Sequence, residues 1–86
     1  MPKPVMLMKT PPTRRFVPFP QINPTPIYLE SSELEALRLV DLEGLSQEDA
    51  GTSMRVSRGT VWRLLQSARK KVAQALTEGR QLIITP

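Results

Sequence analysis

The chain has 86 residues, a formal net charge of +4, and neither cysteine nor histidine. This length allows one domain with a modest core, and the two absences exclude a disulfide framework, a thiolate metal site and histidine-based catalysis. Because the longest apolar runs are also too short for a membrane span or a signal segment, we expect a cytoplasmic protein that is not an enzyme and has no metal, no cofactor and no membrane partner.

The first 26 residues contain eight of the nine prolines. Proline lacks an amide hydrogen and has a fixed φ, so this region cannot form a helix or a central strand. We interpret residues 1–26 as an extended arm in which 5–8 and 15–17 could form edge strands. Residues 27–86 are the predicted domain, and 27–29 lead into its first helix as an extended segment.

The first helix is expected near residues 32–43. Ser31 or Ser32 is a suitable N-cap, and Glu35, three residues after Ser32, completes a capping box. Gly44 is expected to end the helix. Its apolar stripe consists of Leu34, Leu37, Val40 and Leu45, widened by Ala36 and Leu39.

Two further helices are expected near residues 46–54 and 57–78. Ser46 and Ser57 are their predicted N-caps, and Gly79 is expected to stop the third helix. The residues at 82–84 are β-prone. The predicted fold is therefore mainly α, with three helices, a proline-rich arm and a short β-prone tail. The apolar stripe of the third helix is Val61, Leu64, Leu65, Ala68, Val72, Ala75 and Leu76.

Charge is distributed unevenly along the chain. Residues 30–49 carry seven acidic side chains and one arginine, whereas residues 55–71 carry six cationic side chains and no acid. A basic stripe on one helix is typical of a protein that binds a polyanion. The alternative is an ordinary solvated helix face, and the charge alone does not decide between them.

The second and third helices also satisfy the steric requirements of a helix-turn-helix. The motif needs small residues where its two helices cross and an apolar residue in the turn between them. It also needs an N-cap for its second helix and two apolar anchors, three residues apart, on that helix. Arg55 departs from the pattern, because glycine usually stands there; arginine in the left-handed conformation costs about 1 kcal/mol. The matching residues are Ala50, Gly51, Met54, Val56, Ser57, Val61 and Leu64.

In such a motif the N-terminal half of the third helix enters the major groove of DNA. Arginine there can read guanine, and glutamine can read adenine. Trp62 has two interpretations, a contact with thymine methyl groups or sugar, and a packing residue against another element or a second copy. We interpret Lys71 as a solvated charge. The candidate DNA contacts are Gln47, Arg55, Ser57, Arg58, Gly59, Thr60, Trp62, Arg63, Gln66, Arg69 and Lys70.

The segments LSQEDA (45–50), VSRGTV (56–61) and ARKKV (68–72) resemble region four of sigma-70 type factors, which binds promoter DNA and the polymerase flap. The longer run ELEALRLVDLEGLSQEDA (33–50), with VSRGTV and SARKKVAQAL (67–76), is similar to the prokaryotic proteins grouped as uncharacterised protein family 0251, or domain of unknown function 134. The resemblance spans about 29–84 and implies a DNA-binding protein with a sigma-like helix-turn-helix.

The first hypothesis is therefore a transcriptional regulator that binds duplex DNA. The second is a protein-interaction module that contacts RNA polymerase and not DNA. For assembly, the β-prone tail is expected to pair with an N-terminal strand, within one chain or across two. We favour a homodimer that exchanges the arm or the tail; the alternative is a monomer with a disordered arm.

Overall fold

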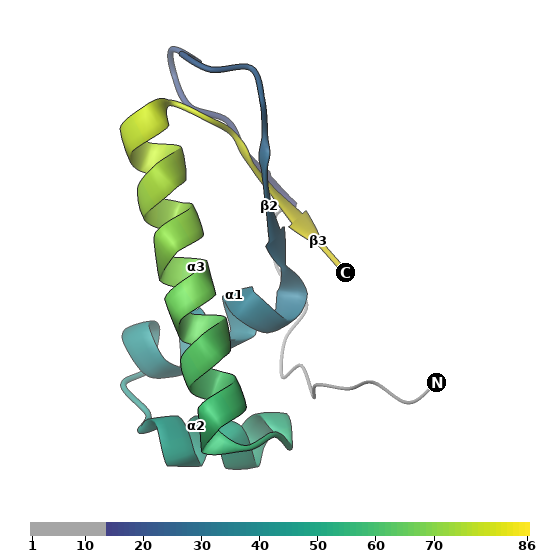
Figure 1. Ribbon diagram of the computed structural model, residues 1–86, viewed down its shortest axis with the longest axis vertical. Helices are drawn as coiled ribbons and strands as arrows, with labels where there is room; N and C mark the ends of the chain where they lie inside the picture. Colours follow the sequence, from purple (N-terminus) through teal and green to yellow (C-terminus); the bar gives the residue numbers. More distant parts are fainter. Residues whose placement is uncertain (1–13) are drawn as a thin grey trace.

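The computed structural model describes residues 14–86, which form a mainly helical protein with a small sheet (Figure 1). This agrees with the mainly α fold of three helices that the sequence predicts, and the expected edge strand at 5–8 lies outside the described residues. The elements in chain order are β1 (Arg15–Phe16), β2 (Ile27–Glu30), α1 (Ser31–Leu37), its π-helical continuation η1 (Arg38–Leu42), α2 (Gln47–Met54), α3 (Arg58–Glu78) and β3 (Leu82–Thr85).

The N-cap of α1 is Glu30, so the prediction of Ser31 or Ser32 is wrong. Glu30 and Glu33 form the capping box, in which the Glu30 amide donates to Glu33 Oε1 at 2.8 Å. Ser31 is not available as a cap because its hydroxyl donates to the Thr85 carbonyl at 2.6 Å. Strand β2 therefore runs directly into the helix, and the start of α1 is fixed by the sheet.

The caps of α2 and α3 are those predicted. Ser46 Oγ accepts a hydrogen bond from the Asp49 amide at 3.0 Å. Ser57 Oγ accepts one from the Thr60 amide at 3.1 Å. Gly79, with φ of +63°, ends α3 in the left-handed conformation that glycine adopts without a steric penalty. These local signals position α2 and α3 as the sequence indicates.

The sheet has the strand order β1-β3-β2, with β3 parallel to β2 and antiparallel to β1. The expected pairing of the C-terminal tail with N-terminal segments is thus confirmed, and it forms within one chain. Residues 21–26 are held against the turn after α3, where the amide of Ile22 donates to the Gly79 carbonyl at 3.0 Å. The guanidinium of Arg80 donates to the carbonyls of Thr25 and Pro26 at 2.8 and 3.3 Å.

The core lies on both sides of α1. At one end of the molecule α1, η1 and α2 surround the first half of α3, and at the other the sheet lies alongside its second half (Figure 1). The predicted stripe of α3 is buried at Val61, Leu65, Ala68 and Ala75, but Leu76 is 79% exposed, which corrects that prediction. Leu76 lies one residue, or 100° of helix rotation, beyond Ala75, and the narrow sheet does not reach around the helix to cover it.

Candidate nucleic-acid interface

The turn between α2 and α3 is tight and depends on two unusual backbone positions. Arg55 adopts the left-handed conformation with φ of +60°, as expected for the residue that replaces glycine there. The Val56 amide then donates to the Gly51 carbonyl at 2.9 Å. A Cβ atom on Gly51 would lie 2.7 Å from the Val56 carbonyl oxygen, so only glycine fits without displacing the backbone. The turn therefore fixes how α3 leaves α2.

Apolar side chains from α2, the turn and α3 fill one cluster with α1 and η1. Met54 and Val61 are completely buried within it, and Val56 and Leu64 pack against its edge. Deeply buried anchors on both sides of a short turn restrict the angle between the helices, because close-packed cores deform little. The exposed face of α3 is thus presented on a rigid support. The cluster is completed by Ala36, Leu39, Val40, Leu45 and Ala50.

Most of the predicted DNA contacts lie together on the exposed face of α3 and in the turn before it. Thr60 is half-buried, and Gln47, at the start of α2, is also half-buried. Trp62 is 52% exposed, so its ring is free on one side. The exposed members of the predicted set are Arg55, Ser57, Arg58, Gly59, Trp62, Arg63, Gln66, Arg69 and Lys70.

A chain of hydroxyl groups connects the N-cap of α3 with Arg63. Ser57 Oγ and Thr60 Oγ1 are 3.0 Å apart, and one guanidinium nitrogen of Arg63 donates to Thr60 Oγ1 at 3.3 Å. The side chain of Arg63 is therefore directed along the first turn of α3, towards its N-terminus. This end of the helix also has unpaired backbone amides and a positive dipole, both of which favour an anionic partner.

The cations of α3 differ in whether an acid neutralises them. Arg69 forms two hydrogen bonds with Asp41, at 2.7 and 3.0 Å, and these bonds lower the pKa of the Asp41 carboxyl. Within residues 14–86, the side chains of Arg55, Arg58 and Lys70 make no ion pair or hydrogen bond. Uncompensated positive charge thus lies mainly at the turn and along the first half of α3.

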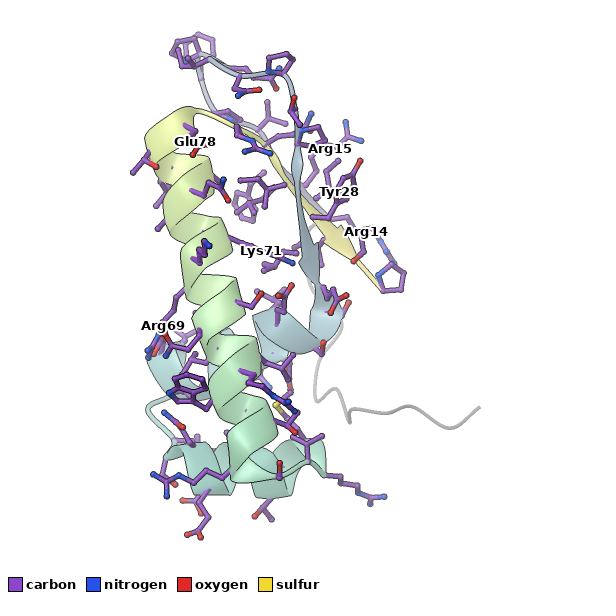
Figure 2. The ribbon with its side chains drawn as sticks, in the orientation of Figure 1. Arg14, Arg15, Tyr28, Arg69, Lys71 and Glu78 are labelled. Atoms are coloured by element: carbon purple, nitrogen blue, oxygen red, sulfur yellow. The ribbon has the colours of Figure 1, made fainter. Side chains whose placement is uncertain are left out.

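Lys71 is not a solvated charge, which corrects that interpretation. Its Nζ donates to the buried Glu33 carboxylate at 2.8 Å, and Figure 2 shows it on the side of α3 opposite Arg69. Burial, the largest single influence, opposes ionisation of Glu33, but hydrogen bonds from Lys71, Ser67 and the Glu30 amide together hold its pKa below the ordinary value. Ser67 and Lys71 stand one turn apart on α3, a spacing that places them on the same side.

The described residues offer little for other chemistry. Among positions 14–86, no group of three or more acidic side chains is close enough together to hold a metal ion. No helix in that range is long and apolar enough to cross a membrane. The clearest chemical feature of this part of the chain is therefore the exposed, uncompensated set of cations beside the turn.

Comparison with known proteins gives consistent matches. Residues 2–86 match the family described as "Protein of unknown function DUF134". A UPF0251 protein of Pyrococcus horikoshii is 58% identical over 84 residues, covering 94% of this chain and 76% of the relative. Its counterpart in Thermococcus kodakarensis is 62% identical, covering 88% of this chain and 70% of the relative. One in Shewanella sediminis is 51% identical, covering 76% of this chain and 68% of the relative. No solved structure was found to match.

Proposed function

We propose that this chain, which belongs to the DUF134 family, binds duplex DNA in a sequence-specific manner and regulates transcription. Helix α2, the turn and α3 would act as a helix-turn-helix of the sigma-70 region four type, with the first half of α3 in the major groove. The observation that carries the proposal is the exposed row of uncompensated arginines at the start of a helix that the tight turn holds rigidly.

The distribution of ion pairs supports this orientation. Two of the three cations in the second half of α3 face acids of the same chain, Arg69 facing Asp41 and Lys71 facing Glu33. Arg55 and Arg58 have no such acid within residues 14–86. A polyanion approaching the protein is therefore attracted most strongly to the turn and the start of α3. A solvated helix face needs no such segregation of charge.

Each exposed residue type has a function that its chemistry allows. Arg58 and Arg63 would read guanine through two hydrogen bonds each, and Gln66 would read adenine. Trp62 would contact thymine methyl groups or the sugar edge. Gly59 leaves space for the backbone to approach DNA, since only Ser57 Oγ lies within 4 Å of a Cβ built there. The expected phosphate contacts are Gln47, Arg55, Ser57, Thr60, Arg69 and Lys70.

The experiment that tests the proposal is selection of bound sequences from a random pool of DNA duplexes, followed by titration of the selected site at several salt concentrations. We expect an enriched consensus, with affinity falling steeply as salt rises because phosphate binding releases counterions. Arg58→Ala should weaken enrichment and relax the consensus at the base that it reads, while Arg14→Ala, which removes the same charge beside the sheet (Figure 2), should not. Binding to RNA polymerase without any enrichment of DNA would instead favour a protein-interaction module.

A further inference from the structure

Arg63 differs from the other exposed cations of α3 because a hydroxyl group, and not an acid, holds its guanidinium. Its Nη2 donates to Thr60 Oγ1 at 3.3 Å, and it makes no ion pair within residues 14–86. In the same range Arg58 makes no hydrogen bond, and Arg69 is neutralised by an acid. Arg63 therefore keeps its full positive charge while the direction of its side chain is restricted.

Thr60 can hold Arg63 because its own position is set by the cap of α3. The Thr60 amide donates to Ser57 Oγ at 3.1 Å, and the two hydroxyl oxygens are 3.0 Å apart. Arginine can only donate, so Thr60 Oγ1 is the acceptor in the bond to Arg63. The two hydroxyl groups carry two protons and share one hydrogen bond, which leaves one proton to donate to a DNA acceptor.

The bond to Thr60 leaves a complete pair of donors on Arg63. A guanidinium can make a bidentate contact either through Nη1 and Nη2 or through Nε and Nη2, because its five N–H groups lie in one planar fork. Nη2 carries one hydrogen for each pair, so the use of one by Thr60 leaves the other pair intact. Two parallel donors match the N7 and O6 acceptors of guanine, whereas adenine and cytosine present an amino group in the major groove.

We infer that Thr60 is a positioning residue that directs Arg63 to a guanine, an inference that rests on the proposed function. The hydroxyl restricts the guanidinium in the free protein, so part of its rotamer freedom is lost before DNA arrives. Immobilising a rotamer-rich side chain during binding lowers affinity by about two- to twelvefold. That loss is reduced only where Arg63 meets its matching base. Thr60 therefore raises the preference for guanine at one position and not the affinity for DNA in general.

The test compares Thr60→Val, which keeps the shape of the side chain but removes the hydroxyl, with Thr60→Ser, which keeps the hydroxyl. Selection with Arg63→Ala first identifies the base pair that Arg63 contacts, because the consensus relaxes there. At that base pair Thr60→Val should lower the preference for guanine by about two- to twelvefold, and Thr60→Ser should restore it. In the Arg63→Ala background, Thr60→Val should have no further effect on that base preference, because the two residues act as one unit.

Thr77→Val is the matched control, because it makes the same change at the opposite end of the same helix. Thr77 Oγ1 donates to the Ala73 carbonyl at 2.9 Å, so its loss should leave every base preference unchanged. A second measurement needs no DNA, namely ¹⁵N relaxation of the arginine Nε–H groups in the free full chain. The Nε–H group of Arg63 should be more ordered than that of Arg58, and Thr60→Val should lower its order to the level of Arg58.

Several results would overturn the inference. A loss of affinity in Thr60→Val that is equal on all sequences would make Thr60 a phosphate contact only. Equal order of Arg58 and Arg63 in the free chain would show that the hydroxyl does not restrict the guanidinium. If a consensus is enriched and Thr60→Val leaves it unchanged, the inference fails while the proposed function stands. If no consensus is enriched, the proposed function and the selection of guanine fail together, and relaxation alone decides whether Thr60 orders Arg63.

Discussion

Replacing Gly51 with alanine should destabilise the protein, although alanine is the better helix former. The new Cβ atom would lie 2.7 Å from the Val56 carbonyl oxygen and 3.5 Å from the Arg58 nitrogen. These are backbone atoms, and the Val56 amide is already tied to the Gly51 carbonyl at 2.9 Å. The chain cannot relieve the contact by rotating a side chain, so the turn itself must move.

The magnitude follows from two opposing effects. An overpacked contact of this kind costs about 1–3 kcal/mol. Alanine in place of glycine within a helix recovers about 1 kcal/mol. The expected net effect is therefore a loss of up to about 2 kcal/mol in the free energy of unfolding. For a domain of this size, each 1 kcal/mol lowers Tm by about 4–8 °C.

Gly59→Ala provides the matched control, because it makes the same change in the first turn of α3. A Cβ atom at Gly59 has only Ser57 Oγ within 4 Å, at 3.9 Å. This variant should gain up to about 1 kcal/mol. Thermal and urea unfolding followed by circular dichroism would measure both. If Gly51→Ala is stabilised as much as Gly59→Ala, the close approach at the turn does not exist, and the main structural support for a helix-turn-helix is lost.

Three further predictions concern binding and folding. Arg58→Ala and Arg63→Ala should each weaken binding to the selected site by about 1–3 kcal/mol, as measured by fluorescence anisotropy. Lys70→Ala should instead weaken binding to all sequences alike and reduce the slope of log affinity against log salt concentration by about one. Equal losses on selected and random DNA for all three variants would indicate a non-specific basic patch. Ser57→Ala should cost about 1 kcal/mol of stability, because it removes the side-chain cap of α3; an unchanged urea midpoint would contradict this. Because the folded pKa of Glu33 is below its ordinary value of 4.5, its charge stabilises the fold above that pH and the contribution disappears as pH falls through the folded pKa. The Tm difference between the parent and Glu33→Gln should therefore shrink on acidification, and a difference that grows would reverse the sign of the argument.

Local signals in the sequence were sufficient for much of the fold and of the candidate site. The caps at Ser46 and Ser57 were predictable because a cap interacts with amides only a few residues away. The left-handed conformation of Arg55 followed from its position in a turn pattern. The exposed face of α3 followed from helical periodicity, which also fixed the buried anchors. Each of these predictions depends on neighbours within about one helical turn.

The predictions that were wrong depend on distant contacts. Ser31 is a good cap in isolation, but its hydroxyl is used by Thr85, 54 residues away. Lys71 has no acid near it in the sequence, yet it binds Glu33, 38 residues earlier. Leu76 fits the apolar period of α3, but the sheet that covers its neighbours ends before reaching it. The sequence pattern specifies which face of a helix is apolar, whereas the width of the opposing sheet decides how much of it is buried.

The acidic stretch at residues 30–49 and the basic stretch at residues 55–71 interact in the folded chain. Two members of the acidic stretch reach α3 and neutralise cations there, Asp41 at Arg69 and Glu33 at Lys71. Both pairs lie in the second half of the helix, so the overall positive charge is concentrated towards the first half without any extra arginine. A helix whose cations were all unpaired would attract a polyanion along its whole length. Pairing two of the three later cations leaves the strongest attraction at the end that the tight turn holds in place, which is where the proposed DNA-binding function needs it.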